Sequence, residues 1–177
     1  MPGGETASSS PTIPVVRADS DPDACDQQIH MPQTMPLLPA RVWSERDWTR
    51  IRAGYRAQDM DEKWNVHTSG VTAFMHRSWT GNRIYQATFA AVEGGWRISS
   101  ALVESDPDHY KRTSDEFDRV MLEVVLSSIV LGEPATELRA EFVELTRRSS
   151  GRADIPGSVL QHSALGQRTE PTPGPRA

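Results

Sequence analysis

Between Trp64 and Glu104 the chain repeats short runs of β-branched and aromatic residues, and this pattern constrains the fold more than any other feature. It predicts four strands, at 62–68, 71–79, 83–92 and 96–104. The runs are separated by Ser69-Gly70, Thr80-Gly81-Asn82 and Gly94-Gly95. Separators of this length and composition are typical of tight hairpins. The segment is therefore expected to form an antiparallel meander.

The loop lengths also predict the pairing register, and with it the two faces of the sheet. One face is apolar and includes Met75, which is paired with Trp64 on one side and Ala87 on the other. The opposite face is polar and slightly basic, as in a sheet with one solvated side. At the end of the apolar face the register predicts one polar row, which reads Glu62, Arg77, Tyr85 and Glu104 across the four strands.

A short helix is predicted before the strands. Ser44 is a candidate N-cap, Asp47 stands three residues later, and Gly54 is a suitable stop. Trp48 and Ile51 lie at helical spacing between them, so one side of this helix is apolar.

Two further helices are predicted after the strands. Thr113 and Glu116 form a T-x-x-E capping box, and a stripe of apolar residues follows at spacings of three and four. This pattern predicts a helix over 114–131 that covers the apolar face of the sheet. A second helix is predicted over 135–147, with Leu138 among its inward residues.

The ends of the chain are rich in Pro, Ser and Asp and poor in apolar residues. Residues 1–39 and 149–177 are therefore expected to be disordered arms on either side of a domain at 40–148. The predicted fold class is α+β: a four-stranded antiparallel meander with a C-terminal helix on one face, a short N-terminal helix and disordered tails.

Composition narrows the classes of function. The net charge of −5 argues against a general nucleic-acid binder, so no nucleic-acid partner is expected. A single cysteine, Cys25, excludes an intrachain disulfide. The longest apolar run contains Glu123 and is too short to cross a bilayer, and no signal peptide is evident. A cytoplasmic protein without a membrane partner, cofactor or metal site is expected.

The stretch Met75 to Gly81, "MHRSWTG", gathers the candidate functional residues. One interpretation is structural: the polar row closes the core, with Arg77 held by Glu62 and Tyr85. The other is a binding site, in which Arg77 presents its guanidinium to a phosphate or carboxylate. The nine candidate ligand-binding residues are His76, Arg77, Ser78, Trp79, Tyr85, Glu62, Lys63, Asp59 and Asp61.

Three motifs carry a resemblance to a known family: D-M-D-E-K-W at 59–64, H-R-S-W-T-G-N-R-I-Y at 76–85, and G-G-W-R at 94–97. Over about residues 45–131 the chain resembles a small bacterial domain that has no assigned activity. The resemblance implies stand-alone proteins and fusions to ADP-ribose-processing macro domains. A link to ADP-ribose or nucleotides follows from that association alone.

Two functions remain open. The first is a non-catalytic binding or regulatory module for a small anionic or nucleotide-like ligand, or for a protein partner. The alternative is a hydrolase acting on a phosphate-containing small molecule, with Arg77 holding the anion and His76 or Asp61 as base. The candidates form no complete catalytic set, because His76 and Ser78 stand two apart on one strand, too far for a direct hydrogen bond.

Overall fold

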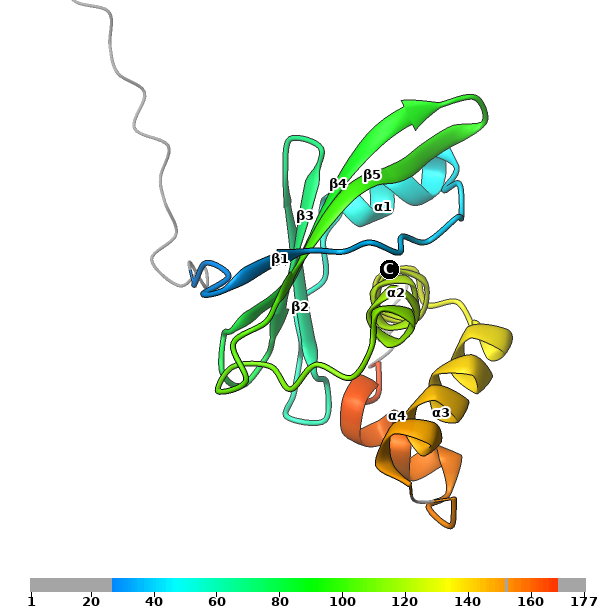
Figure 1. Ribbon diagram of the computed structural model, residues 1–177. Helices are drawn as coiled ribbons and strands as arrows, with labels where there is room; N and C mark the ends of the chain where they lie inside the picture. The colour runs from blue at the N-terminus through cyan, green and yellow to red at the C-terminus, as the bar shows by residue number, and fades with distance from the viewer. Residues whose placement is uncertain (1–26, 152, 169–177) are drawn as a thin grey trace, which may run out of the picture.

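The computed structural model describes residues 27–151 and 153–168, which form one antiparallel sheet with helices packed on one face (Figure 1). The strands are β1 (Pro32–Thr34), β2 (Trp64–Ser69), β3 (Thr72–Arg77), β4 (Arg83–Val92) and β5 (Gly95–Glu104). The helices are α1 (Glu45–Ala53), α2 (Asp115–Val124), α3 (Thr136–Ser150) and α4 (Gly157–Leu165), and a π-helical turn, η1 (Val125–Val130), continues α2. The strand order is β1-β5-β4-β3-β2, with every neighbouring pair antiparallel. The predicted α+β class with an antiparallel meander is confirmed, but the sheet has five strands instead of four.

The fifth strand, β1, comes from the segment that was expected to be a disordered arm. It pairs with β5, with Pro32 opposite Glu104 and Thr34 opposite Leu102. The expectation is therefore wrong for residues 27–39, and residues 1–26 lie outside the described chain. A three-residue strand has no periodic pattern of its own, and its pairing depends on the edge that β5 offers.

The C-terminal arm was also expected to be disordered, and α4 corrects this expectation. Leu160 and Leu165 of α4 are buried. The chain then pairs with the strand region, since Gly166 bridges Glu62 and the N–H of Gln167 donates to the Asp61 carbonyl at 3.1 Å. The domain thus extends to residue 168, and residues 169–177 lie outside the described chain.

The predicted register is wrong at all three hairpins, by two residues in each of the first two. In the third, Tyr85 lies opposite Val103 and not Glu104. Trp64 lies opposite Arg77, and Met75 lies between Val66 and Tyr85. The first turn is Gly70-Val71, with Gly70 at φ +60°, one position later than expected. In the first two hairpins a shift of two residues leaves the side chains of β2 and β3 on their predicted faces. In β5 a shift of one residue turns Ala101 and Val103, both buried, toward the core, and the predicted polar row is not formed.

The second hairpin also contains a β-bulge. The register shifts between Met75 and His76, and Ile84 is the additional residue on β4. Ile84 is fully buried, although strict alternation along β4 would place it on the polar face. A bulge re-aims the side chains of its strand, which a count of alternating residues cannot anticipate.

The helix termini follow local capping rules. The capping box of α1 is present as predicted: the Ser44 hydroxyl accepts from the N–H of Asp47, and the Asp47 carboxylate accepts from the N–H of Ser44. Gly54 ends the helix at φ +76°. For α2 the N-cap is Ser114, which accepts from the N–H of Phe117, and not Thr113 as expected.

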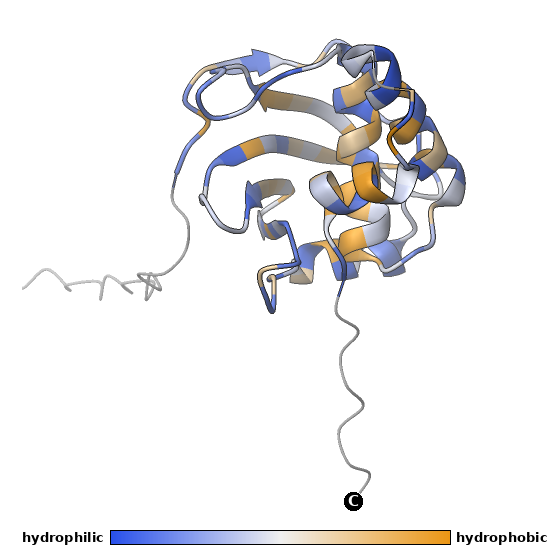
Figure 2. Cartoon of the chain, turned by 90° about the horizontal axis from the view of Figure 1, so that it is seen from below, coloured by the Kyte–Doolittle hydropathy of each residue, from blue (hydrophilic) through white to orange (hydrophobic). Residues whose placement is uncertain are grey.

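The core lies between the apolar face of the sheet and the helices. Phe89 of β4 contacts the rings of Trp43 and Trp48, and α2 contributes Met121 to the same core. Viewed from below in Figure 2, the strands and helices alternate hydrophobic and hydrophilic residues, as expected for elements with one buried side. Among the described residues, no helix combines the length and apolar character required to span a membrane.

Candidate ligand-binding groove

A groove of about 410 Å³ lies between the loop before β2 and the turn that joins β3 to β4. Volumes of this order are typical of small-molecule sites. Four of the nine candidate residues line it, Asp59, Lys63, Ser78 and Trp79. The other lining residues are Arg56, Ala57, Gln58, Met60 and Asn65.

Two carboxylates hold the loop that forms one wall of the groove. Glu62 is buried and accepts from the Tyr55 hydroxyl at 2.5 Å and from the backbone N–H of Gln58. Asp59 Oδ1 accepts from the backbone N–H of Asp61 at 2.9 Å, closing a turn. Glu62 thus supports the loop and does not pair with Arg77, contrary to the predicted row.

Ser78 joins the other wall to the same loop. Its N–H donates to the Lys63 carbonyl at 3.1 Å and its hydroxyl donates to the Glu62 carbonyl at 2.6 Å. These bonds end β3 at Arg77 and present the next residue, Trp79, to solvent. Trp79 is 58% exposed, a large fraction for this residue type.

Positive charge lies beside the exposed indole. The Lys63 ammonium is 5.2 Å from the centre of the Trp79 ring and donates to the Met60 carbonyl at 2.9 Å. Arg56 is exposed on the opposite wall. Met60 is 89% exposed and adds a flexible apolar side chain to the rim.

Arg77 lies behind the groove and does not line it. Its guanidinium carbon is 4.1 Å from the centre of the Trp64 ring and 5.4 Å from that of Trp79. Nη1 donates to the Ala164 carbonyl at 2.7 Å, and Trp64 Nε1 donates to the same oxygen at 3.0 Å. Burial lowers the pKa of Arg77, while the neighbouring tyrosines oppose the shift. The arrangement holds the C-terminal end of α4 against the sheet, where the helix dipole favours a cation.

His76 is buried on the other face of the sheet, beside histidine and arginine. Its ring stacks on that of His67 at 5.0 Å, and Arg83 Nε donates to His76 Nε2 at 3.2 Å. Burial, together with the positive charges of His67 and Arg83, lowers the pKa of His76 to about 3. A neutral imidazole that already accepts from Arg83 is poorly suited to act as a general base at neutral pH.

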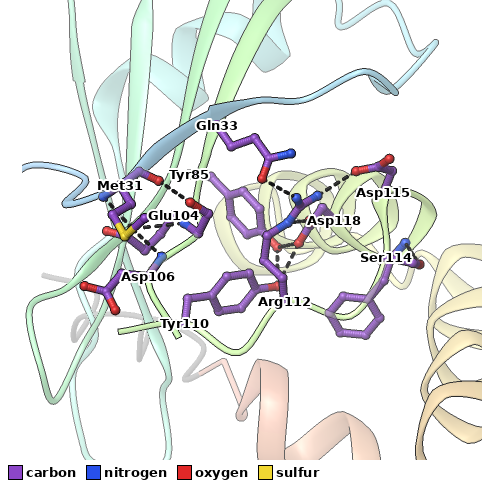
Figure 3. A network of polar contacts seen from close by, with 12 residues as sticks. Met31, Gln33, Tyr85, Glu104, Asp106, Tyr110, Arg112, Ser114, Asp115 and Asp118 are labelled. Atoms are coloured by element: carbon purple, nitrogen blue, oxygen red, sulfur yellow. Dashed lines mark hydrogen bonds and ion pairs between the residues drawn. The ribbon is translucent and has the colours of Figure 1, made fainter. Parts of the chain in front are cut away.

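Tyr85 belongs to a buried polar network on the helical side (Figure 3). The hydroxyls of Tyr85 and Tyr110 are 2.7 Å apart, and each lies 2.9 Å from Asp118 Oδ1. Burial, followed by the negative charge of Asp118, raises the pKa of Tyr110, and burial is also the largest cause of the raised pKa of Tyr85. Arg112 Nε donates to Asp118 Oδ2 at 2.7 Å. The network ties α2 to the sheet, and it does not reach the groove.

Of the nine candidate residues, four line the groove and five do not. Asp61, Glu62, His76, Arg77 and Tyr85 do not line the groove. Among the lining residues that the candidate set lacks, Met60 stands inside the D-M-D motif, and its place between two acidic turn residues was a usable signal. Arg56 carried no local signal, because only the fold of the loop brings it near Trp79.

The low pKa of His76 predicts a specific pH dependence of stability. The unfolded chain protonates this group near pH 6.5 and the folded chain near pH 3, so stability falls as the pH drops through 6.5. Between pH 7.5 and pH 5 the loss from this group is expected to be about 1–2 kcal/mol. His76→Gln keeps an acceptor for Arg83 and should remove the pH-dependent loss of stability that His76 causes. Urea unfolding of both proteins across this range checks it, and parallel pH profiles would contradict the prediction.

The chain was compared with protein families, curated proteins and solved structures. No family model, curated protein or solved structure matches the chain. The function is therefore inferred from the groove.

Proposed function

We propose that the protein is a non-catalytic binding module whose groove takes a small anionic ligand that carries a planar ring, such as a nucleotide. The observation that carries the proposal is that the exposed Trp79, Lys63 and Arg56 line the same groove of about 410 Å³. Flat apolar surface and positive charge together match the two parts of such a ligand.

Trp79 supplies the surface for the ring. Stacking of a base on an aromatic side chain is worth about 1–3 kcal/mol. The two hydrogen bonds of Ser78 fix the backbone immediately before Trp79, so the position of Trp79 at the end of β3 is set before a ligand arrives. Pre-organisation of this kind reduces the entropy lost on binding.

Lys63 and Arg56 supply the charge for the anionic group. The Lys63 ammonium has three N–H donors, one of which is used by the Met60 carbonyl. Arg56 offers a planar guanidinium that suits phosphate or carboxylate oxygens. Asp59 on the same wall is an acceptor suited to a hydroxyl or amino group of the ligand.

The geometry favours binding over the hydrolase alternative. That alternative needs Arg77 to hold an anion, but the guanidinium is stacked on Trp64 and bonded to the Ala164 carbonyl. It also needs His76 or Asp61 as a base near the ligand, and neither residue lines the groove.

Calorimetric titration with ADP, ADP-ribose, ribose 5-phosphate and inorganic phosphate tests the proposal. ADP or ADP-ribose is expected to bind, with phosphate and ribose 5-phosphate weaker because they have no ring to stack. Trp79→Ala and Lys63→Ala are each expected to weaken binding about tenfold, corresponding to about 1.4 kcal/mol. The matched control is Arg97→Ala, which removes an exposed cation of β5 outside the groove and should bind as the wild type does. The proposal fails if none of the four compounds binds, or if Trp79→Ala binds with unchanged affinity.

A further inference from the structure

Two histidines and an aspartate from distant parts of the chain meet at the end of the sheet where β1 joins β5. They are His30, just before β1, and Asp106 and His109, both in the loop after β5. One potential ligand atom from each residue lies within 4.8 Å of those of the other two. His30 Nδ1 and Asp106 Oδ2 are 2.6 Å apart, and the two imidazole rings are 4.9 Å apart.

We propose that His30, Asp106 and His109 form a binding site for a divalent transition-metal ion of the zinc type. Zinc bonds of about 2.0–2.2 Å in tetrahedral geometry place the ligand atoms about 3.3 Å from one another. The three side chains reach that spacing by small rotations, since His30 and His109 are both partly exposed. Two imidazoles and one carboxylate favour zinc, cobalt, nickel or copper over calcium and magnesium, which prefer oxygen ligands.

The Asp106 side chain is already oriented for this role. Its Oδ1 accepts from the backbone N–H of Asp108 at 3.0 Å, which leaves Oδ2 directed at His30. The backbone hydrogen bond therefore sets the direction of the oxygen that would meet the ion before the ion binds.

Glu104 fixes the backbone that carries two of the three ligands (Figure 3). Its buried carboxylate accepts from the N–H of His30 at 2.6 Å, of Met31 at 2.8 Å and of Asp106 at 3.0 Å. Oε2 also lies 3.8 Å from His109 Nδ1. A carboxylate beside a ligating histidine is the usual outer-sphere support of a metal site.

The position of the site gives the ion a structural consequence. His30 and Asp106 are 76 residues apart in sequence, so one ion would join the segment at β1 to the loop between β5 and α2. With three protein ligands, a fourth coordination position remains for water or an exchangeable group. Binding would stabilise the pairing of β1, because the ligands come together only in the folded chain.

Titration of the chelator-treated full chain with Zn²⁺ and Co²⁺ tests the proposal. Zn²⁺ is expected to bind at one equivalent and raise the Tm, and Co²⁺ to give the visible absorption bands of a four- or five-coordinate site. His30→Ala and His109→Ala should each weaken binding by more than the roughly 10–100-fold that loss of an outer-sphere partner costs. Far-UV circular dichroism checks that both variants remain folded.

Two control variants test whether other side chains that can ligate a metal account for the binding. His67→Ala removes an exposed histidine of the open sheet face, and Cys25→Ser removes the thiol; both should bind Zn²⁺ as the wild type does. The proposal is overturned if no stoichiometric binding occurs, if the His30 and His109 variants bind normally, or if the Cys25 variant loses binding while they keep it.

Discussion

Replacing Asp118 with alanine is expected to lower the free energy of unfolding by about 3–5 kcal/mol. The carboxylate is fully buried and lies 2.9 Å from the hydroxyls of both Tyr85 and Tyr110, while Arg112 donates to its other oxygen at 2.7 Å. Its removal leaves two buried hydroxyls and a cation without their shared acceptor, which costs their desolvation.

The matched control is Asp115→Ala. Asp115 also pairs with Arg112, at 2.6 Å, but its side chain is 43% exposed. Exposed ion pairs are worth about 0–1 kcal/mol, so this variant should be nearly neutral. Urea unfolding of the two variants measures the difference. Equal losses in the two variants would show that the buried network does not hold α2 to the sheet.

Arg77→Ala is expected to cost about 2–4 kcal/mol and to loosen α4. The substitution removes a guanidinium stacked on Trp64 and the bond of 2.7 Å to the Ala164 carbonyl at the C-terminal end of α4. Arg77→Met keeps most of the packing on Trp64 and loses only the polar part, so its cost should be smaller.

Hydrogen exchange over residues 157–168 distinguishes this role from a general loss of stability. Protection of α4 should fall more than that of β4 and β5 in Arg77→Ala, and less so in Arg77→Met. If α4 keeps its protection in Arg77→Ala while the global stability falls, Arg77 does not act through the helix terminus.

Hairpin and helix signals in the sequence were sufficient to predict that β2 to β5 and α1 form. Their information is local: alternating apolar residues give the faces, and Ser44 with Asp47 gives a helix start. Register was less accessible, because a turn displaced by one residue moves each pairing by two without changing the faces. The apolar face was therefore predicted for β2 and β3 but not at the irregular positions of β4 and β5, and the partner of Arg77 was not predicted.

The candidate site shows the same division. The H-R-S-W-T-G stretch drew attention to the turn after β3, where Ser78 and Trp79 line the groove. Sequence proximity also led to His76 and Arg77, which the strand places on opposite sides of the sheet and away from the groove. Neighbours in sequence share a site only where the backbone turns, since a strand separates successive side chains.

The sequence by itself determined the α+β class, the faces of β2 and β3 and the turn that carries Trp79, because these depend on the order of residues within one short segment. Only the tertiary structure decided the contacts between distant segments. The Ala164 carbonyl meets Arg77 across 87 residues, and His30 meets Asp106 across 76. No local pattern encodes such pairs, since they form when β1 and α4 dock on a sheet whose shape is set by the whole core.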